Sequence, residues 1–260
     1  MSGLNGTFES MDVPPVSHRN LASSSDTIGA VVLPAPTGVR REVEAHKARR
    51  RLYPVTALYT SYAMAVLGIA MRTSHRTAAV VWFALGIAAW TWLEYLVHRH
   101  ILHGRFPDAQ SMWRHALHKY FDHLHIEHHQ RPWDGNHVSG TIRDTLPVAL
   151  PLALFSFLFP FHTAPLFLAG LLQAYIAEEW VHHSVHFCQF KGRYFQYIKR
   201  HHLYHHSPKG AGVGYGLSSG VWDVVWQTRI PEDERRLLYA RSAGRRIGGS
   251  SAAPGPPSLA

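Results

Sequence analysis

Long uncharged apolar stretches alternate with short polar segments along the middle of the chain. Residues 52–71 form twenty consecutive residues without a charge, and residues 77–93 are also uncharged. A helix needs about 20 apolar residues to cross the hydrocarbon core of a membrane. We therefore expect two membrane-spanning helices here, joined by the polar turn at 72–76, with the second helix ending near His98.

A third uncharged stretch covers residues 145–177 and is interrupted by Pro147, Pro151, Pro160 and Pro165. This stretch is too long for one average span, and proline interrupts helices. It predicts a helical hairpin that turns near 160–165 and contributes two short spans. Beyond it, a glycine-rich turn at 209–216 precedes a short apolar segment whose Trp222 and Trp226 are typical of an interfacial helix.

The number of spans decides on which side of the membrane the polar segments lie. Two spans precede the first histidine-rich segment and two more separate it from the second, so both segments belong on one face. Basic residues near span ends mark the cytoplasmic side, and residues 40–51 and 235–246 are rich in arginine. We expect an all-α, integral-membrane four-span bundle with a cytosolic histidine-rich helical cap, and with both termini in the cytoplasm.

Composition sets the domain boundaries and excludes some functions. Residues 1–45 and most of 232–260 are rich in Ser, Pro and Gly and predict disordered tails, the first of which is not a signal peptide, around a membrane domain at 46–231. The net charge of +9 does not indicate nucleic-acid binding, because the chain lacks a known reader motif. The single cysteine, Cys188, excludes an internal disulfide and cysteine-rich metal ligation.

Ten of the histidines gather in four clusters close to the ends of the apolar stretches. Offsets of three and four residues place side chains on one face of a helix. The clusters HIEHH, HHSVH and HLYHH have these offsets, and HRHILH has an offset of five, about 140° on a regular helix. The ten residues are His98, His103, His125, His128, His129, His182, His186, His202, His205 and His206.

The offset of five in the first cluster sets a condition. His98 and His103 face one site only if the helix ends or kinks between them, and otherwise they bind different metals. Six other histidines fit neighbouring patterns as second choices, namely His100, His115, His118, His123, His183 and His201. Among the carboxylates near the clusters, Glu94 and Glu178 are the better candidates to accept a hydrogen bond from a ligand's second ring nitrogen, because a carboxylate near the end of an apolar span needs a partner.

Imidazole ligates iron, zinc, copper and nickel, and ten imidazoles exceed what one ion accepts. We therefore expect two metal ions, each with about five nitrogens or with nitrogens and water. A dinuclear iron site with neutral ligands is strongly electrophilic, which suits attack on an unactivated C–H bond. The membrane setting favours a lipid chain as the substrate.

With these residues the chain resembles the fatty acid hydroxylase and sterol desaturase superfamily of integral-membrane di-iron enzymes, and it is most similar to the fatty acid 2-hydroxylases. The resemblance covers residues 52–231. It rests on WTWLEYLVHRHILH from Trp90, on HIEHH followed by QRP, and on the run from His182 through GVGYGLSSGVWDVVWQT.

The resemblance implies that the ten histidines ligate two iron ions, with zinc as the metal that purified protein can carry instead. It implies hydroxylation of an acyl chain by O2, with electrons from outside. Some fifty residues precede the first span and contain no HPGG-type haem motif, so we expect a separate cytochrome b5-like or ferredoxin donor in place of a fused cytochrome b5 domain.

Two alternatives stay open. A desaturase or a sterol or carotenoid oxidase of the same superfamily would use the same ligands. A non-enzymatic metal-binding membrane protein is the alternative of another class, although a transport pathway would place ligands within the spans.

Overall fold

The regular structure is helical throughout the part of the chain that the computed structural model describes, residues 37–103, 112, 116 and 123–239. This confirms the all-α class for those residues. In chain order the elements are α1 (Gly38–Ala70), α2 (Arg76–Leu96), the π-helix η1 (Val97–Leu102), α4 (His123–Gln130), α5 (Ile142–Ser156), α6 (Ala164–Phe187), α7 (Arg193–His205), the 3-10 helix η3 (Pro208–Gly210) and α8 (Val221–Val225). Residues 232–239 are also helical.

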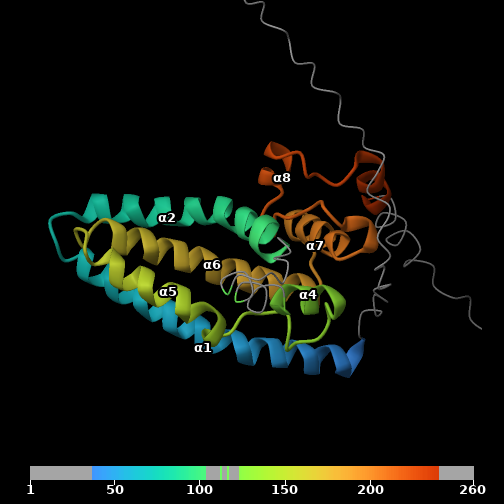
Figure 1. Ribbon diagram of the computed structural model, residues 1–260, viewed down its shortest axis with the longest axis horizontal. Coiled ribbons are helices and arrows are strands. Elements are labelled where there is room, and N and C mark those ends of the chain that lie inside the picture. The colour runs from blue at the N-terminus through green and yellow to red at the C-terminus, as the bar shows by residue number, and fades with distance from the viewer. Residues whose placement is uncertain (1–36, 104–111, 113–115, 117–122, 240–260) are drawn as a thin grey trace, which may run out of the picture. The chain divides into compact units, whose positions relative to one another are not determined.

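Helix α6 is the centre of the helical bundle, because it contacts α1, α2, α5 and α7. Figure 1 shows α1, α2, α5 and α6 running side by side, with α4, α7 and α8 gathered near one end of these four helices. One apolar cluster joins α1, α5 and α6 through Val55, Ala149 and Leu172, all buried. The bundle therefore holds the carboxyl-terminal ends of α2 and α6 next to α4 and α7.

Two glycines allow α2 and α6 to touch backbone to backbone. A Cβ atom on Gly86 would lie 2.0 Å from the carbonyl oxygen of Phe167, and one on Gly170 would lie 2.0 Å from that of Phe83. Small residues at such crossings let membrane helices approach closely. The crossing fixes α2 against α6, and both helices lead directly to histidine clusters.

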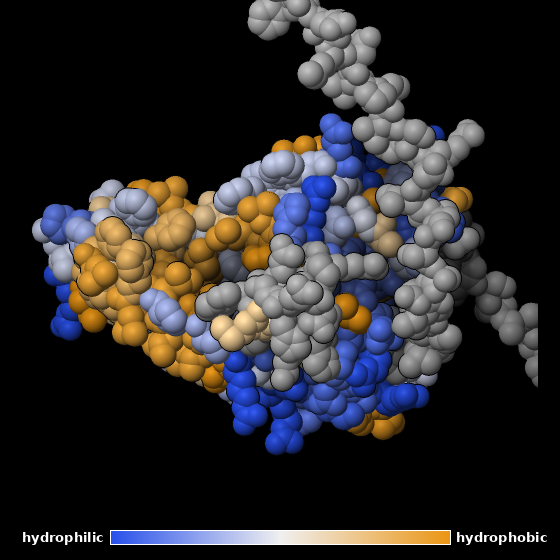
Figure 2. Space-filling model, viewed as in Figure 1, coloured by the Kyte–Doolittle hydropathy of each residue, from blue (hydrophilic) through white to orange (hydrophobic). Residues whose placement is uncertain are grey.

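On the face shown in Figure 2, the part of the bundle that lies away from the histidine clusters is mostly apolar, as its orange colour shows. Exposed large side chains there include Met64, Ile69, Leu85, Leu154 and Leu158. Within the described residues, α1 and the continuous helix Arg76–Leu102 are long and apolar enough to cross a membrane. Helix α5 has 15 residues, or about 22 Å, and the four-span arrangement stays a prediction.

The predicted hairpin is a pair of helices in the structure. Helix α5 ends at Ser156 and α6 begins at Ala164 with Pro165 in its first turn, so the turn contains Pro160 as expected. The predicted interfacial segment forms the short helix α8. The sequence predicted the hairpin and this helix because they depend on the positions of proline and tryptophan along the chain.

The predicted end of the N-terminal tail at residue 45 lies too late, because α1 begins at Gly38. The extra turns are held by tertiary contacts: Ala45 and Ala48 are buried against Val138 and Phe187. The backbone N–H of Gly135 donates to Glu44 at 3.0 Å. Residues 1–36 and 240–260, on which the rest of both predicted tails falls, lie outside the described residues.

Candidate metal centre

The ten predicted histidines lie close together, on or directly after four helical segments that meet at one end of the bundle. His98 lies in η1 and His103 follows it, α4 carries three of the ten, the last turns of α6 carry His182 and His186, and α7 and its C-cap carry the remaining three. The structure brings all ten together in two groups of five. Group A is His98, His103, His125, His129 and His205, and group B is His128, His182, His186, His202 and His206.

The π-helix explains how His98 and His103 reach the same group. A π-helix bonds residue i to residue i+5, and the N–H of His103 donates to the carbonyl of His98 at 3.1 Å. This bond brings the two side chains to the same side of the helix, and their ring centroids lie 5.0 Å apart. His98 and His103 can therefore face one site because the helix changes to a π-helix between them and then ends. The alternative that the two residues bind different metals is not favoured.

Each histidine triplet is divided between the groups. In α4 the pair at offset four, His125 and His129, belongs to group A, whereas His128 belongs to group B. In α7 the pair His202 and His206 belongs to group B, whereas His205 belongs to group A. Consecutive residues on a helix point about 100° apart, so the adjacent histidines of one triplet face different centres.

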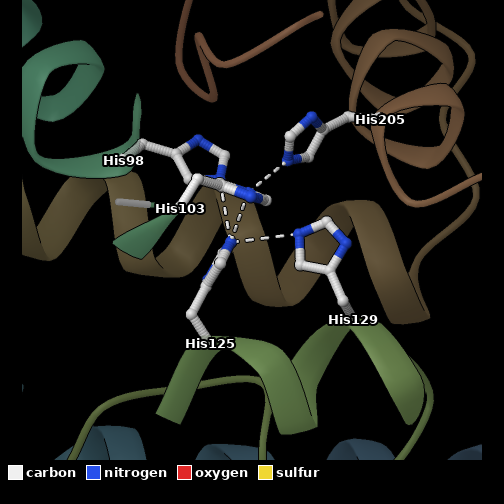
Figure 3. A group of neighbouring side chains, drawn as sticks. All are labelled: His98, His103, His125, His129 and His205. Carbon is white, nitrogen blue, oxygen red and sulfur yellow. Dashed lines mark hydrogen bonds between the residues drawn. The ribbon is translucent and has the colours of Figure 1, made fainter. Parts of the chain in front are cut away.

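The nitrogens of group A converge on one point, as Figure 3 shows. His125 Nε2 lies 3.1 Å from His98 Nε2, 2.8 Å from His103 Nε2 and 3.0 Å from His129 Nε2. One ring nitrogen carries either one proton or one lone pair, so it cannot form three separate hydrogen bonds. Neighbouring ligands at right angles around an ion ~2.1 Å away would be about 3 Å apart. The donor set of group A therefore fits a metal ion.

Group B has the same internal geometry. His182 Nε2 lies 2.9 Å from His128 Nε2, and His202 Nε2 lies 2.9 Å from both His186 Nε2 and His206 Nε2. In each group the ligand atoms all lie within 4.8 Å of one another. The groups adjoin through His129 and His206, whose ring centroids are 4.2 Å apart. Two ions held this way would be neighbours in one centre.

Burial keeps these imidazoles neutral. It lowers the pKa of His129 to about 2 and that of His205 to about 4. It also lowers the pKa values of His125, His128 and His202 well below the ordinary range. Repulsion from neighbouring imidazoles adds to the effect of burial for His129 and for these last three residues. A neutral imidazole offers a lone pair to a metal, and a protonated one does not. These five imidazoles, which come from both groups, are therefore in the ligating form at neutral pH.

The second ring nitrogens differ between the groups. In group A, His98 Nδ1 lies 2.5 Å from the carbonyl oxygen of Tyr215, and His205 Nδ1 lies 2.8 Å from that of Val213. A carbonyl only accepts, so Nδ1 carries the proton in both residues and the Nε2 lone pair faces the centre. In group B, the Nδ1 atoms of His128, His186, His202 and His206 are buried without a hydrogen-bond partner among the described residues.

The carboxylates expected to support the ligands have other partners. Glu94 accepts from the backbone N–H groups of Leu217 and Ser218, and Glu178 accepts from Trp90 Nε1 at 3.1 Å. Neither contact involves an imidazole. The expectation that Glu94 and Glu178 accept a hydrogen bond from a ligating histidine is therefore wrong for the described residues. Backbone carbonyls take the role for His98 and His205, and residue patterns do not reveal carbonyl positions.

The second-choice histidines lie outside both groups where the structure describes them. His183 Nε2 lies 3.2 Å from the carbonyl oxygen of Ala45, and His201 Nε2 lies 3.1 Å from Asp223. His100 is exposed. His115, His118 and the side chain of His123 lie outside the described residues.

A cavity of about 450 Å³ borders both groups. Histidines of group A and group B line one part of it, and Trp90, Thr145 and Tyr175 from α2, α5 and α6 line another. A cavity of this size is typical of small-molecule sites. It connects the space among the bundle helices with the two histidine groups.

The fold and the paired imidazole groups define a helical protein with a candidate dinuclear metal centre at the end of an apolar bundle. Comparison with known families gives the closer assignment, because a sequence profile described as fatty acid hydroxylase matches residues 83–228. The chain belongs to the fatty acid hydroxylase family. This confirms the resemblance found in the sequence.

Curated relatives include fatty acid 2-hydroxylase of Rattus norvegicus, 33% identical over 58% of this chain and 40% of the relative. Dihydroceramide fatty acyl 2-hydroxylase of Arabidopsis thaliana is 34% identical over 56% of this chain and 59% of its own. A solved structure of full-length scs7p, in which only the hydroxylase domain is visible, matches with a TM-score of 0.61 and 25% identity over 69% of this chain and 67% of that chain. The chain spans about two fifths of the length of the mammalian relatives.

Proposed function

We propose that this protein is a membrane di-iron oxygenase that hydroxylates the acyl chain of a lipid, as a fatty acid 2-hydroxylase does. The ten histidines of groups A and B would hold two iron ions, and zinc can occupy the same nitrogens in purified protein. Iron bound there would supply the activation of O2 needed to oxidise a C–H bond. A separate cytochrome b5-like or ferredoxin donor would supply the electrons.

One observation carries this proposal: a single cavity reaches from the bundle helices to both imidazole groups. Trp90 and Tyr175 line it on the bundle side, and His98 and His128 line it at groups A and B. A lipid chain lying among apolar helices could enter this cavity and place one of its carbons next to the centre. The names of the relatives, which act on fatty acyl groups, support the same substrate class.

The proposal includes the topology. Helices α1, α2, α5 and α6 would form four spans, with the histidine-rich cap and both chain ends on the cytoplasmic side. The basic residues in the amino-terminal part of α1 support this orientation. Cysteines introduced as Ile126→Cys on α4 and Lys209→Cys after α7 should be labelled from the cytoplasm, and Thr73→Cys between α1 and α2 should be labelled only from the other side. The background is Cys188→Ser. Labelling of the first two from opposite sides would contradict the four-span proposal.

Lipid profiling tests the activity. Cells that express the protein should contain acyl lipids with one added oxygen atom, derived from isotopically labelled O2. Cells that express His205→Ala should lack them, and cells that express His100→Ala should keep them, because His100 is exposed outside both groups. Loss of two hydrogen atoms instead would identify a desaturase. No change in any lipid, combined with bound metal, would favour the non-enzymatic alternative.

A further inference from the structure

In a segment beside group A, five consecutive backbone N–H groups each donate a hydrogen bond. The N–H of Gly214 donates to the Thr228 carbonyl at 2.8 Å. The next two donate to Asp223, from Tyr215 at 2.9 Å and from Gly216 at 2.8 Å. The two after that, on Leu217 and Ser218, donate to Glu94 at 2.5 and 2.6 Å. Five consecutive donors are thus fixed, and we call residues 213–218 the anchored loop.

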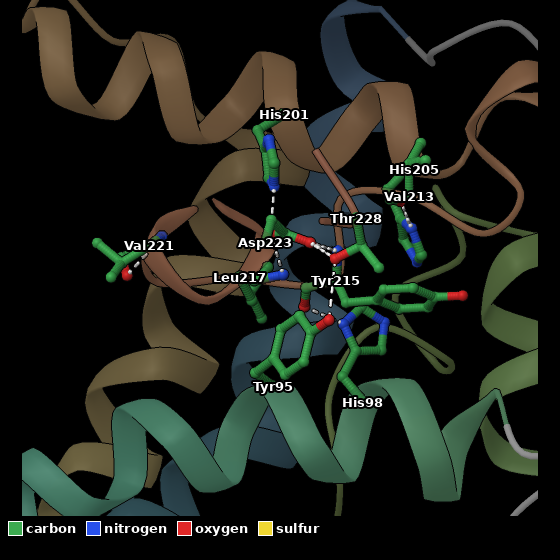
Figure 4. Close-up of polar contacts among 12 residues, drawn as sticks. Tyr95, His98, His201, His205, Val213, Tyr215, Leu217, Val221, Asp223 and Thr228 are labelled. Carbon is green, nitrogen blue, oxygen red and sulfur yellow. Dashed lines mark hydrogen bonds and ion pairs between the residues drawn. The ribbon is translucent and has the colours of Figure 1, made fainter. Parts of the chain in front are cut away.

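The carbonyl groups of the anchored loop face group A. The carbonyl oxygens of Val213 and Tyr215 accept from His205 Nδ1 and His98 Nδ1. Figure 4 shows both contacts together with the side chains behind the loop. The loop that presents these two oxygens donates four of its backbone N–H groups to Asp223 and Glu94. The positions of the oxygens therefore depend on these two carboxylates.

Asp223 is the most enclosed part of this arrangement, with 0% exposure. Besides the two loop donors it accepts from Thr228 Oγ1 at 2.7 Å and lies 3.1 Å from His201 Nε2. Thr228 in turn contacts Tyr95 Oη at 2.9 Å. Burial alone raises the pKa of Asp223, but the hydrogen bonds from His201 and Thr228 outweigh it and lower the pKa below its ordinary value. The side chain is therefore an ionised acceptor.

The glycines of the loop are required by this geometry. Gly214 has φ +74°, which L side chains rarely adopt, and a Cβ on Gly216 would lie 2.9 Å from Asp223 Oδ2 and 2.0 Å from the carbonyl oxygen of Ser219. Only glycine lets the backbone approach the carboxylate this closely. The sequence GVGYG is thus matched to Asp223, which lies seven and eight residues beyond its two backbone donors.

We propose that Asp223 is a positioning residue for the metal held by group A and not for the metal held by group B. It acts through the anchored loop, whose two carbonyls hold the protons of His98 and His205 on Nδ1 and so direct their Nε2 lone pairs at the ion. Group B has no such contact at the Nδ1 atoms of His128, His186, His202 and His206 among the described residues. This inference rests on the proposed metal centre.

The test uses the whole chain of 260 residues, with one group disabled. His206→Ala removes a ligand of group B and leaves the metal of group A, whereas His103→Ala does the reverse. Into each background we would introduce Asp223→Asn, which keeps the shape of the side chain but leaves one loop N–H without an acceptor. Fe²⁺ is titrated anaerobically against a competing chelator, and bound iron per chain is measured.

Asp223→Asn should weaken Fe²⁺ binding about 10- to 100-fold in the His206→Ala background, the range seen when a partner of a metal-ligating histidine is lost. It should leave binding in the His103→Ala background unchanged. The matched control Asp144→Asn alters a carboxylate that caps α5 by accepting from the N–H of Thr141, and it should change neither. Thr228→Val, which removes one donor to Asp223 and keeps the loop bonds, should weaken only group A and by less.

The outcomes separate the two proposals. If the parent protein does not bind about two iron ions per chain, the proposed metal centre fails. If it binds two and Asp223→Asn weakens both backgrounds equally, or neither, the positioning role is overturned while the centre stands. Thermal unfolding of the metal-free variants shows whether Asp223→Asn has damaged the fold, and in that case the result with Thr228→Val decides.

Discussion

Groups A and B each contain five imidazoles, but the two groups are supported differently. Group A takes two of its histidines from the π-helix region, and a loop orients two of its rings through the carbonyls of Val213 and Tyr215. Group B takes its histidines from three regular helices and the C-cap of α7, and four of its rings have no partner at Nδ1 among the described residues. The comparison teaches that equal ligand sets do not make equal sites, because the contacts behind the ligands orient them.

The largest effect should come from separating the two groups at adjacent residues. His205 belongs to group A and His206 to group B, so His205→Ala and His206→Ala should each lower the metal content from about two ions to about one per chain, and each should abolish lipid oxidation. Metal analysis and lipid profiling measure both effects. The two variants should retain different ions, distinguishable by Mössbauer spectra of the iron-loaded proteins. Loss of both ions from each variant would show that the groups are not separate sites.

A second prediction concerns the close crossing of α2 and α6, which supports both groups. A Cβ added at Gly86 would lie 2.0 Å from a backbone oxygen of α6. We therefore expect Gly86→Leu to lower the free energy of unfolding by about 1–3 kcal/mol and the thermal midpoint by about 3–10 °C. The control is Gly68→Leu on α1, where nothing lies within 4 Å of the added Cβ.

The midpoint should be measured in detergent for both variants, with metal content alongside. Gly86→Leu should weaken metal retention in groups A and B together, since α2 carries the chain into His98 and α6 carries His182 and His186. A variant that weakened only one group would contradict the role of this crossing in supporting both groups. Equal midpoints for Gly86→Leu and Gly68→Leu would contradict the close crossing itself.

The smallest expected difference concerns the unmodified protein. Because two rings of group A have fixed Nδ1 protons, its ion should leave more slowly than that of group B when a chelator is added, by about tenfold. Metal content followed over time should show two phases. His206→Ala should remove the fast phase and His205→Ala the slow one, and a single phase in the parent protein would mean that the anchored loop does not distinguish the groups.

Local signals in the sequence were sufficient for the elements and for the ligand types. Uncharged stretches predicted α1 and α2, the prolines around Pro160 marked the turn between α5 and α6, and offsets of three to five selected the ten histidines that the structure gathers. These signals depend on chain neighbours, which share a helix whatever the rest of the molecule does. The helical start at Gly38 was missed because Ala45 and Ala48 are held by Val138 and Phe187, which are distant in sequence.

The sequence by itself determined that this is a helical, histidine-rich member of the fatty acid hydroxylase family, because spacing and motif are properties of the chain. Only the tertiary structure decided that each triplet divides between two groups, that a π-helix joins His98 to His103, and that Asp223 lies behind the loop of group A. These depend on where four helix ends meet. A residue at offset three and one at offset four lie on opposite sides of a helix face, about 100° apart, and only the packing of α6 and α7 against α4 shows which centre each one reaches.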